Sequence, residues 1–291
     1  MPVRYYEVKP MDLPEGHDRR LTPARPDLAA AHLRGIIAAE RYVEGTVHSV
    51  RTTRAALRRE PRSNAGLETE ALFGEAVRVF EETAEGWCFV QLERDGYVGY
   101  MPAQALGPAI TPTHKVCALR TFVFPSADIK LPPVMDVCFA SPVAVREVKG
   151  TFAMTDLGFI PTVHLAPLEE VAADPVAEAL RFLEVPYLWG GRSSLGIDCS
   201  GLVQTALMAC GIPAPRDSDM QEQALGAELP LDGPFRRGDL LFWPGHVGLV
   251  ENGETLLHAN AFHMAVSREN LADALARIAA AGPALRRARR L

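Results

Sequence analysis

The sequence predicts an α+β protein in which small β-barrels precede a mixed helix–strand domain. From residue 45 to about residue 168, short apolar–polar alternations recur between glycine turns, which is typical of small barrels. From residue 169 onward, apolar residues recur at helical spacing after Cys199, and strand-like segments follow around His246 and His258. At 291 residues, the chain is long enough for two or three such domains.

Composition narrows the class of protein. Hydrophobic residues make up 48% and charged residues 23%, as in ordinary globular proteins, and a net charge of −6 makes nucleic acid an unlikely partner. No stretch approaches the ~20 apolar residues of a membrane span, and residues 1–13 lack the apolar core of a secretory signal. The oligomeric state is left open.

Cysteine usage indicates the compartment. The five cysteines are an odd number without a C-x-x-C pair, so the sequence favours neither a disulfide framework nor a structural zinc site. They are Cys88, Cys117, Cys138, Cys199 and Cys210. Free thiols persist in reducing compartments, and we therefore expect a cytoplasmic protein.

Residues 1–44 form an N-terminal extension. Within it, residues 27–41 place Leu28, Ala31 and Gly35 near one face of a predicted helix. We expect this helix to lie as a strap across the following domain, and we assign it no function.

Two barrel-like segments follow. Alternating strands are predicted in the first, residues 45–108, at 46–51, 76–81, 87–92 and 97–101. Their order resembles a bacterial SH3-like (SH3b) domain, most closely at residues 72–75 and 96–102. The pattern repeats more weakly in residues 109–168, where strands are predicted at 116–124, 143–145 and 151–154. In addition, GFIP (158–161) is similar to GYMP (99–102) at the end of the first segment. We therefore interpret residues 109–168 as a second, degenerate SH3-like domain.

The last domain, residues 169–291, begins with a predicted helix at 175–183 that Asp174 caps. A second helix starts at Cys199, and Gly211 and Pro213 end it. A helix N-terminus carries partial positive charge and free N–H groups, which favour a thiolate. Cys199 is therefore a candidate nucleophile, with a small buried cysteine as the competing interpretation. Cys210, on the apolar stripe of the same helix, is expected in the core.

Two histidines favour the nucleophile. ENGE (251–254) between His246 and His258 is a hairpin signal, and the midpoint of the two histidines is Asn252. A turn centred there would place both imidazoles directly opposite each other on one face. A cysteine, a histidine base and a second histidine that orients the first form a nucleophilic catalytic unit.

At this point a family resemblance is clear. The segments that carry it are PYLWGG (186–191), DCSGLV (198–203), PRDS (215–218), RGDLLF (237–242), HVG (246–248) and HA (258–259). From about residue 174, the chain resembles the NlpC/P60 family of papain-like cysteine peptidases, which cleave bacterial cell-wall peptides. The Cys-His-His set resembles the γ-D-glutamyl-L-diamino acid endopeptidases of this family. Barrels before such a domain resemble the architecture of cytoplasmic enzymes that recycle murein peptides.

The resemblance implies a site. Cys199 would be the nucleophile, His246 the base and His258 the orienter. Substrate contacts would come from Tyr187, Asp198, Ser200, Asp217 and Ser218. For three of these residues a purely structural role is the alternative. Tyr187 could be a core aromatic, Asp198 could favour the helix start through its charge, and Ser218 could be the N-cap of an S-x-x-Q capping box. His263 is expected to be a rim residue.

The expected function is hydrolysis of the γ-D-glutamyl–diamino acid bond of murein peptides with a free N-terminal L-Ala, without a cofactor. An amidase or acyltransferase on the same scaffold is one alternative. A cell-wall-binding SH3b protein with peptidoglycan hydrolase activity is another. One cysteine and two histidines could also hold zinc, but the sequence offers no evident fourth ligand, and no metal is predicted.

Overall fold

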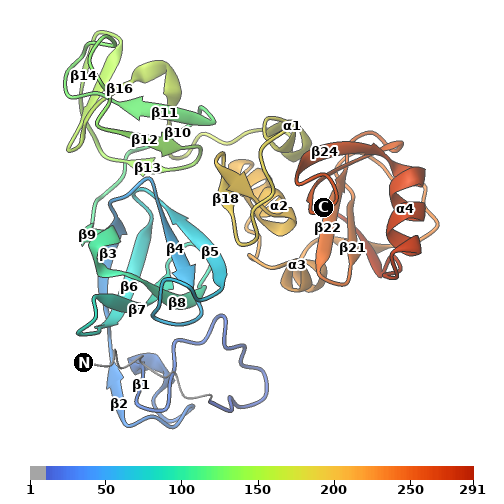
Figure 1. Cartoon of the computed structure of the whole chain (residues 1–291), viewed down its shortest axis with the longest axis horizontal. Coiled ribbons are helices and arrows are strands. Elements are labelled where there is room, and N and C mark those ends of the chain that lie inside the picture. Colours follow the sequence, from blue (N-terminus) through green and yellow to red (C-terminus); the bar gives the residue numbers. More distant parts are fainter. Residues whose placement is uncertain (1–10) are drawn as a thin grey trace. The chain divides into compact units, whose positions relative to one another are not determined.

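The computed structural model describes residues 11–291, which form two compact units: one ends at Pro167 and the other spans Leu168–Leu291 (Figure 1). Within the described residues, no helix combines the length and apolar character needed to cross a bilayer. None of the cysteines forms a disulfide there either.

The N-terminal extension is not helical, so the predicted helix over residues 27–41 is wrong. Instead, β1 (Leu28–Ala30) pairs in parallel with β2 (Arg41–Val43), and a short 3-10 turn, η1 (Ala31–Leu33), follows β1. The three residues of β1 are all buried, which leaves no polar face for an amphipathic helix, and Gly35 adopts a left-handed φ of 81° that ends the turn. The expected position is confirmed, because these residues pack on the barrel that follows.

That barrel is built from one sheet in the order β5-β4-β8-β7-β6-β3-β9. Its strands are β3 (Thr46–Val50), β4 (Arg54–Arg58), β5 (Leu67–Leu72), β6 (Ala76–Glu82), β7 (Trp87–Leu92), β8 (Val98–Pro102) and β9 (Leu106–Pro108), with η2 (Ala103–Ala105) before the last. The strands predicted between residues 46 and 101 are thus confirmed. Their inward side chains, among them Leu57, Val90 and Met101, form the core of the barrel.

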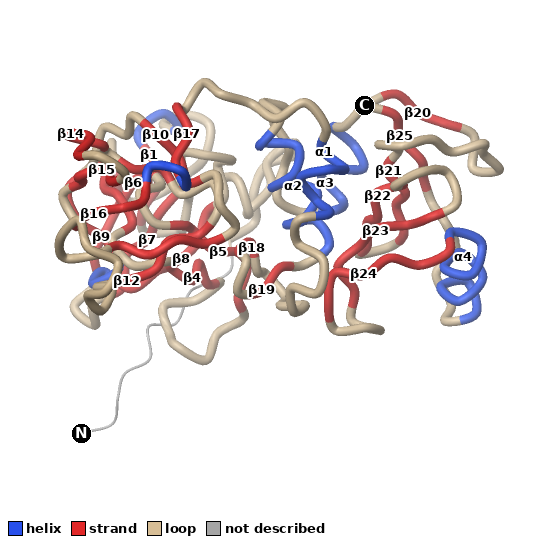
Figure 2. The backbone as a smooth tube through the Cα atoms, turned by 90° about the horizontal axis from the view of Figure 1, so that it is seen from above, coloured by secondary structure: helices blue, strands red, loops and turns tan. Residues whose placement is uncertain are grey.

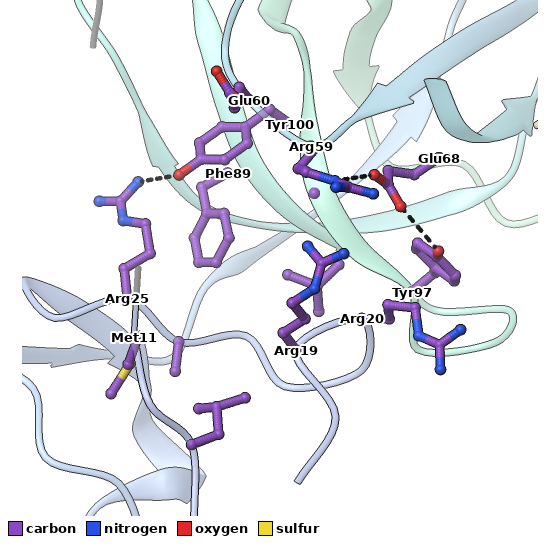
Figure 3. Close-up of a pocket in the computed structure, with 14 residues that line it drawn as sticks. Met11, Arg19, Arg20, Arg25, Arg59, Glu60, Glu68, Phe89, Tyr97 and Tyr100 are labelled. Carbon is purple, nitrogen blue, oxygen red and sulfur yellow. Dashed lines mark hydrogen bonds and ion pairs between the residues drawn. The ribbon is translucent and has the colours of Figure 1, made fainter. Parts of the chain in front are cut away.

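A cavity of about 440 Å³ lies between the extension and this sheet (Figure 3). Polar side chains that line the cavity form hydrogen bonds with one another. The Arg25 guanidinium donates to the Tyr100 hydroxyl at 3.2 Å, and the Tyr97 hydroxyl donates to Glu68 at 3.3 Å. Arg25 also contacts Glu81 of β6 at 2.5 Å. The two contacts of Arg25 fasten the extension to the barrel.

The rest of the N-terminal unit consists of three small sheets in the orders β13-β10-β17, β11-β12 and β14-β15-β16. Their strands are β10 (His114–Val116), β11 (Arg120–Val123), β12 (Met135–Cys138), β13 (Pro142–Val143), β14 (Val145–Lys149), β15 (Phe152–Thr155), β16 (Gly158–Pro161) and β17 (Leu165–Pro167), with η3 (Thr162–His164) before the last. The single strand predicted at 116–124 is wrong. The segment forms two strands instead, because β10, which ends at Val116, pairs with β17, whereas β11 pairs with β12.

The C-terminal unit is an antiparallel sheet with helices on both faces (Figures 1 and 2). The sheet has the order β20-β25-β21-β22-β23-β24. Its strands are β20 (Ala227–Leu229), β21 (Leu240–Trp243), β22 (His246–Val250), β23 (Thr255–Asn260), β24 (Ala265–Asn270) and β25 (Arg287–Arg290). The helices are α1 (Pro175–Leu180), α2 (Cys199–Ala209), α3 (Ser218–Ala224) and α4 (Leu271–Ala280), and β18 (Arg192–Ser193) pairs with β19 (Gly196–Ile197) before α2.

The helices position the site by covering opposite faces of this sheet. Helix α4 lies on one side and α1, α2 and α3 lie on the other (Figures 1 and 2). Leu271, Ala274 and Ile278 of α4 pack on Leu241 and Leu256 of the sheet. Helix α2 contacts β22 and β23, and this contact brings its first residue to the strands that carry the two histidines.

Candidate active site

Helix α2 begins at Cys199, as predicted. Asp198 is its N-cap, and the Oδ1 atom of Asp198 accepts a 2.7 Å hydrogen bond from the Gly201 N–H. The helix ends at Ala209, and after the C-cap comes Gly211, whose φ of 75° suits a helix C-terminus. Cys210 is the C-cap and only partly buried, so the expected core position is wrong.

Cys199 is only 6% exposed, and the N–H groups of Ser200 and Val247 face its sulfur. Burial, and the nearby Asp198 carboxylate, raise the pKa of this thiol to about 12, which outweighs the two N–H groups. The N–H groups lower the pKa of the thiol, as predicted for a helix N-terminus, but burial has the larger effect. The thiol keeps its proton until a base removes it.

The two histidines meet, although not as directly opposed partners. The hairpin pairs Leu249 with Leu257 and Val250 with Leu256, which centres the turn on Gly253 rather than Asn252. This register shifts the partners by two residues, so the histidines are diagonal neighbours and still share a face. Nε2 of His246 and Nδ1 of His258 lie 2.9 Å apart and share a hydrogen bond.

Behind His258 lies a residue that the sequence interpretation missed. Nε2 of His258 is 2.7 Å from Oε2 of Glu269 on β24, and Arg277 of α4 donates to the same oxygen at 2.6 Å. The available signal was the alternation through residues 265–270, which puts Ser267 and Glu269 on one face. It could not reveal that this face turns toward His258.

Burial sets the charge of both imidazoles. It lowers the pKa of His246 to about 3, with the neighbouring His258 contributing, and the pKa of His258 to about 4 despite the opposing effect of Glu269. Both rings are therefore neutral near pH 7. A neutral His246 has one unprotonated ring nitrogen and can serve as a general base.

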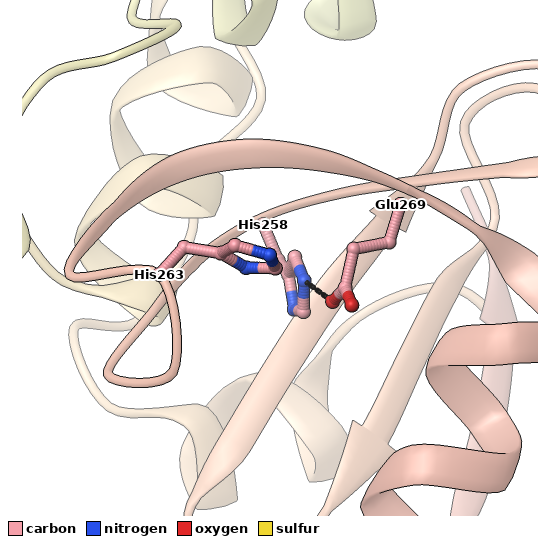
Figure 4. A group of neighbouring side chains, drawn as sticks. All are labelled: His258, His263 and Glu269. Atoms are coloured by element: carbon pink, nitrogen blue, oxygen red, sulfur yellow. Dashed lines mark hydrogen bonds and ion pairs between the residues drawn. The ribbon is translucent and has the colours of Figure 1, made fainter.

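His258, His263 and Glu269 also lie close enough to hold a metal ion, with their ligand atoms within 4.8 Å of one another (Figure 4). The surroundings oppose a cation, because Arg277 donates to both oxygens of Glu269. In addition, the Nδ1 atom of His263 lies 3.1 Å from the side chains of both Asn260 and Ser267. The group fits a chain of hydrogen bonds better than a metal centre.

Asp198 and Ser200 are held by a buried arginine. Arg216 is 1% exposed and donates to the two oxygens of Asp198 at 2.9 and 2.8 Å and to the Ser200 hydroxyl at 3.0 Å. Asp198 also accepts from the Gly190 N–H at 2.8 Å. The sequence interpretation missed Arg216, and with it the neutralisation of Asp198. Substrate contact by Asp198 and Ser200 stays a prediction.

Of the other predicted contacts, Tyr187 lies between α1 and β18, and Asp217 and Ser218 lie at the start of α3. Tyr187 is half-buried, and burial and the neighbouring Cys199 raise the pKa of its hydroxyl, which therefore keeps its proton as a donor. Asp217 is the N-cap residue of α3, whereas Ser218 is the first helical residue, so the capping-box alternative for Ser218 is wrong. Instead of reaching back to the helix start, the buried Gln221 side chain donates to the carbonyls of Ser200 and Pro215 at 2.9 and 2.8 Å.

A buried cysteine at a helix start, beside a sheet that carries a bonded pair of neutral imidazoles, defines a cysteine hydrolase with a histidine base. Sequence comparison names the family. The chain belongs to the NlpC/P60 family of cysteine peptidases, whose profile matches residues 184–277. A second profile, described as the Sh3 domain of bacterial dipeptidyl-peptidases, matches residues 57–106.

Relatives agree over much of the chain. Dipeptidyl-peptidase 6 of Lysinibacillus sphaericus is 31% identical over 69% of this chain and 83% of its own length. The γ-D-glutamyl-L-lysine dipeptidyl-peptidase of Bacillus subtilis is 31% identical over 66% of this chain and 72% of its own. An NlpC/P60 family protein of Bacillus cereus has the same fold, with a TM-score of 0.71 at 20% identity over 84% of this chain and 99% of its own. The predicted α+β fold, with an SH3-like region before a papain-like NlpC/P60 domain, is confirmed.

Proposed function

We propose that this peptidase hydrolyses the γ-D-glutamyl–diamino acid bond of murein peptides that carry a free N-terminal L-Ala. The observation that carries the proposal is the buried Cys199, whose sulfur faces the N–H of Val247, next to His246, which is hydrogen-bonded to His258. The name of the Bacillus subtilis relative supports the bond, since that protein is a γ-D-glutamyl-L-lysine dipeptidyl-peptidase.

The proposed reaction is acyl transfer through a thioester. His246 takes the proton of the Cys199 thiol as the sulfur attacks the γ-glutamyl carbonyl carbon. The N–H of Cys199 and the hydroxyl of Tyr187 would stabilise the oxyanion. His246 then gives its proton to the leaving amine of the diamino acid. Finally, water adds to the thioester with His246 as base, which releases the acid and restores the thiol.

Recognition of the free N-terminus is assigned to the PRDS segment. Arg216 pairs with Asp198, and Asp217 and Ser218 are the carboxylate and hydroxyl proposed to meet the ammonium group. Ser200, held by Arg216, would line the cleft next to the nucleophile. A charge-assisted hydrogen bond to an ammonium is worth about 1.5–3 kcal/mol.

The test is incubation with L-Ala-γ-D-Glu-L-Lys and its diaminopimelate counterpart, followed by mass spectrometry. The expected products are L-Ala-D-Glu and the free diamino acid. Cys199→Ala should abolish cleavage, whereas the matched control Cys210→Ala should retain it. N-acetylation of the peptide should lower kcat/KM at least about tenfold, since 1.4 kcal/mol is one decade.

Other outcomes would favour the alternatives. Equal cleavage of the acetylated peptide or of intact peptidoglycan would support a wall hydrolase. Release of ammonia or acyl transfer without peptide cleavage would support an amidase or acyltransferase. An active Cys199→Ala variant with an inactive Cys210→Ala variant would remove the nucleophile assignment.

We also propose that residues 109–168 are a second SH3-like domain after a first at 45–108, with the peptidase domain at 169–291. Support comes from a repeated local order: β8, η2 and β9 in the first segment correspond to β16, η3 and β17 in the second. An experimental structure in which residues 109–168 do not close into a barrel would contradict this.

The proposed compartment is the cytoplasm, where peptides released from the wall would be the substrate. The disulfide-free cysteines of the described chain support a reducing compartment. Cell fractionation of the native host is the check, and recovery in the culture medium would contradict it.

A further inference from the structure

A line of hydrogen bonds runs from the helix α4 to the catalytic base. It joins Arg277, Glu269, His258 and His246 in that order. We propose that Glu269, held by Arg277, is a positioning residue that fixes the tautomers of both histidines, so that His246 presents an unprotonated Nδ1 for the proton of Cys199. The inference deepens the proposed function and rests on it for its activity measurement.

The first step is the state of Glu269. Arg277 donates from Nε to Oε1 at 3.0 Å and from Nη2 to Oε2 at 2.6 Å. Burial alone would raise the pKa of Glu269, but the hydrogen bonds from Arg277 and His258 hold it below its usual range. Glu269 is thus an ionised carboxylate, which can only accept hydrogen bonds.

The second step is the direction of each bond. Because Oε2 of Glu269 only accepts, Nε2 of His258 must carry a proton and donate it. In the neutral ring, Nδ1 of His258 is then an acceptor, so Nε2 of His246 must be the donor across the 2.9 Å contact. The neutral His246 therefore has its lone pair on Nδ1. The Glu269 carboxylate thus determines, through His258, which ring nitrogen of His246 is basic.

The third step is what holds the carboxylate. The Arg277 guanidinium lies over the ring of Phe262, 4.3 Å from its centroid, which fixes the arginine from the loop between β23 and β24. Arg277 of α4 and His258 of β23 thus hold Glu269 from two sides. Without the acceptor, His258 could place its proton on either nitrogen, and His246 would spend part of its time with Nδ1 protonated and unable to act as base.

The experiment compares two substitutions of similar size. Glu269→Gln keeps an oxygen that can accept from His258, whereas Glu269→Met keeps the length of the side chain without an acceptor. Glu251→Met is the matched control, because Glu251 is a buried glutamate in the turn between β22 and β23 whose carboxylate pairs with Arg268 of β24. Each variant is assayed with L-Ala-γ-D-Glu-L-Lys, its thermal unfolding is recorded, and the imidazole ¹⁵N resonances of histidine-labelled protein are measured.

We expect Glu269→Gln to keep most of the wild-type kcat, and Glu269→Met to lose at least about tenfold in kcat with little change in KM. Glu251→Met should lower the unfolding temperature and leave kcat near wild type. In the wild type and in Glu269→Gln, both histidines should carry their proton on Nε2. In Glu269→Met, the resonances of His246 and His258 should report a mixture of tautomers.

Two results would overturn the proposal. One is a kcat of Glu269→Met equal to that of Glu251→Met. The other is a wild-type spectrum with the proton of His246 on Nδ1, a measurement that decides even if Glu269→Met does not fold. The spectra need no substrate, so an inactive wild type would count against the proposed function alone, and the tautomers would still test the role of Glu269.

Discussion

Burial affects the protonation of the proposed catalytic side chains more strongly than local charge does. Cys199 sits at the start of α2, where free N–H groups favour a thiolate, yet its enclosure raises the pKa of the thiol to about 12. The same enclosure lowers the pKa of His246 to about 3. Both groups therefore start neutral, and under the proposed function we expect proton transfer to accompany attack on the substrate instead of preceding it.

Acid should destabilise the C-terminal unit through these buried histidines. An exposed imidazole of the unfolded chain titrates near ~6.5, whereas burial holds the pKa of His258 in the folded chain at about 4. As the pH falls below about 6.5, the unfolded state binds protons that the folded state does not bind. The free energy of unfolding therefore decreases until the pH reaches the pKa of the folded state. The expected slope is up to about 1.4 kcal/mol per pH unit for each buried histidine.

Urea unfolding between pH 6.5 and 5, roughly above the carboxylate range, is the measurement. His258→Asn should show a shallower decline than the wild type, because one buried imidazole is gone. The matched control is His263→Asn, which removes an exposed imidazole of the same unit and should keep the wild-type slope. Equal slopes in all three proteins would contradict the assignment.

At the scale of elements, the start of α2 depends on a buried ion pair, whereas the start of α1 depends on an exposed one. Asp198 caps α2 and pairs with Arg216, with side chains 10% and 1% exposed. Asp174 caps α1 and pairs with Arg237, with side chains 39% and 44% exposed. The two caps have the same chemistry and differ in burial, which makes each the control for the other.

Asp198→Asn should destabilise the fold far more than Asp174→Asn. Asparagine can cap a helix as aspartate does, so the difference isolates the charge. Leaving Arg216 buried without its partner should cost about 3–5 kcal/mol, whereas an exposed pair contributes about 0–1 kcal/mol. Urea unfolding monitored by circular dichroism measures both, and similar losses would show that the burial of Arg216 does not matter.

At the scale of the whole molecule, each of the two units has its own core. The apolar cluster between the sheet and α4 contains residues of the C-terminal unit alone, and the barrel core contains residues of the N-terminal unit alone. A core made within one segment of the chain allows that segment to fold by itself.

Residues 168–291 expressed alone should therefore unfold in one cooperative transition and retain a buried Cys199. Thermal unfolding and the rate of thiol labelling at Cys199 under native conditions are the measurements, with Cys210, which is partly exposed, as the internal reference. A fragment without a cooperative transition, or one whose Cys199 reacts as fast as Cys210, would show that this unit needs the rest of the chain.

The sequence by itself determined the parts of the site that depend on neighbours along the chain. Asp198 capping a helix that starts at Cys199 follows from adjacent residues, and His246 and His258 share a face because strand side chains alternate with a period of two. Even the error in the hairpin centre left both rings on one face, since it moved the partners by an even number of residues.

The tertiary structure alone decided which side chains stand behind these residues. Arg216 pairs with Asp198 from eighteen positions away, and Glu269 reaches His258 only through the register of β23 with β24 and the placement of α4. The extension, too, became strand instead of helix because its apolar residues are buried on the barrel. Contacts between distant segments set these outcomes, and a local pattern of polarity carries no information about the partner across such a contact.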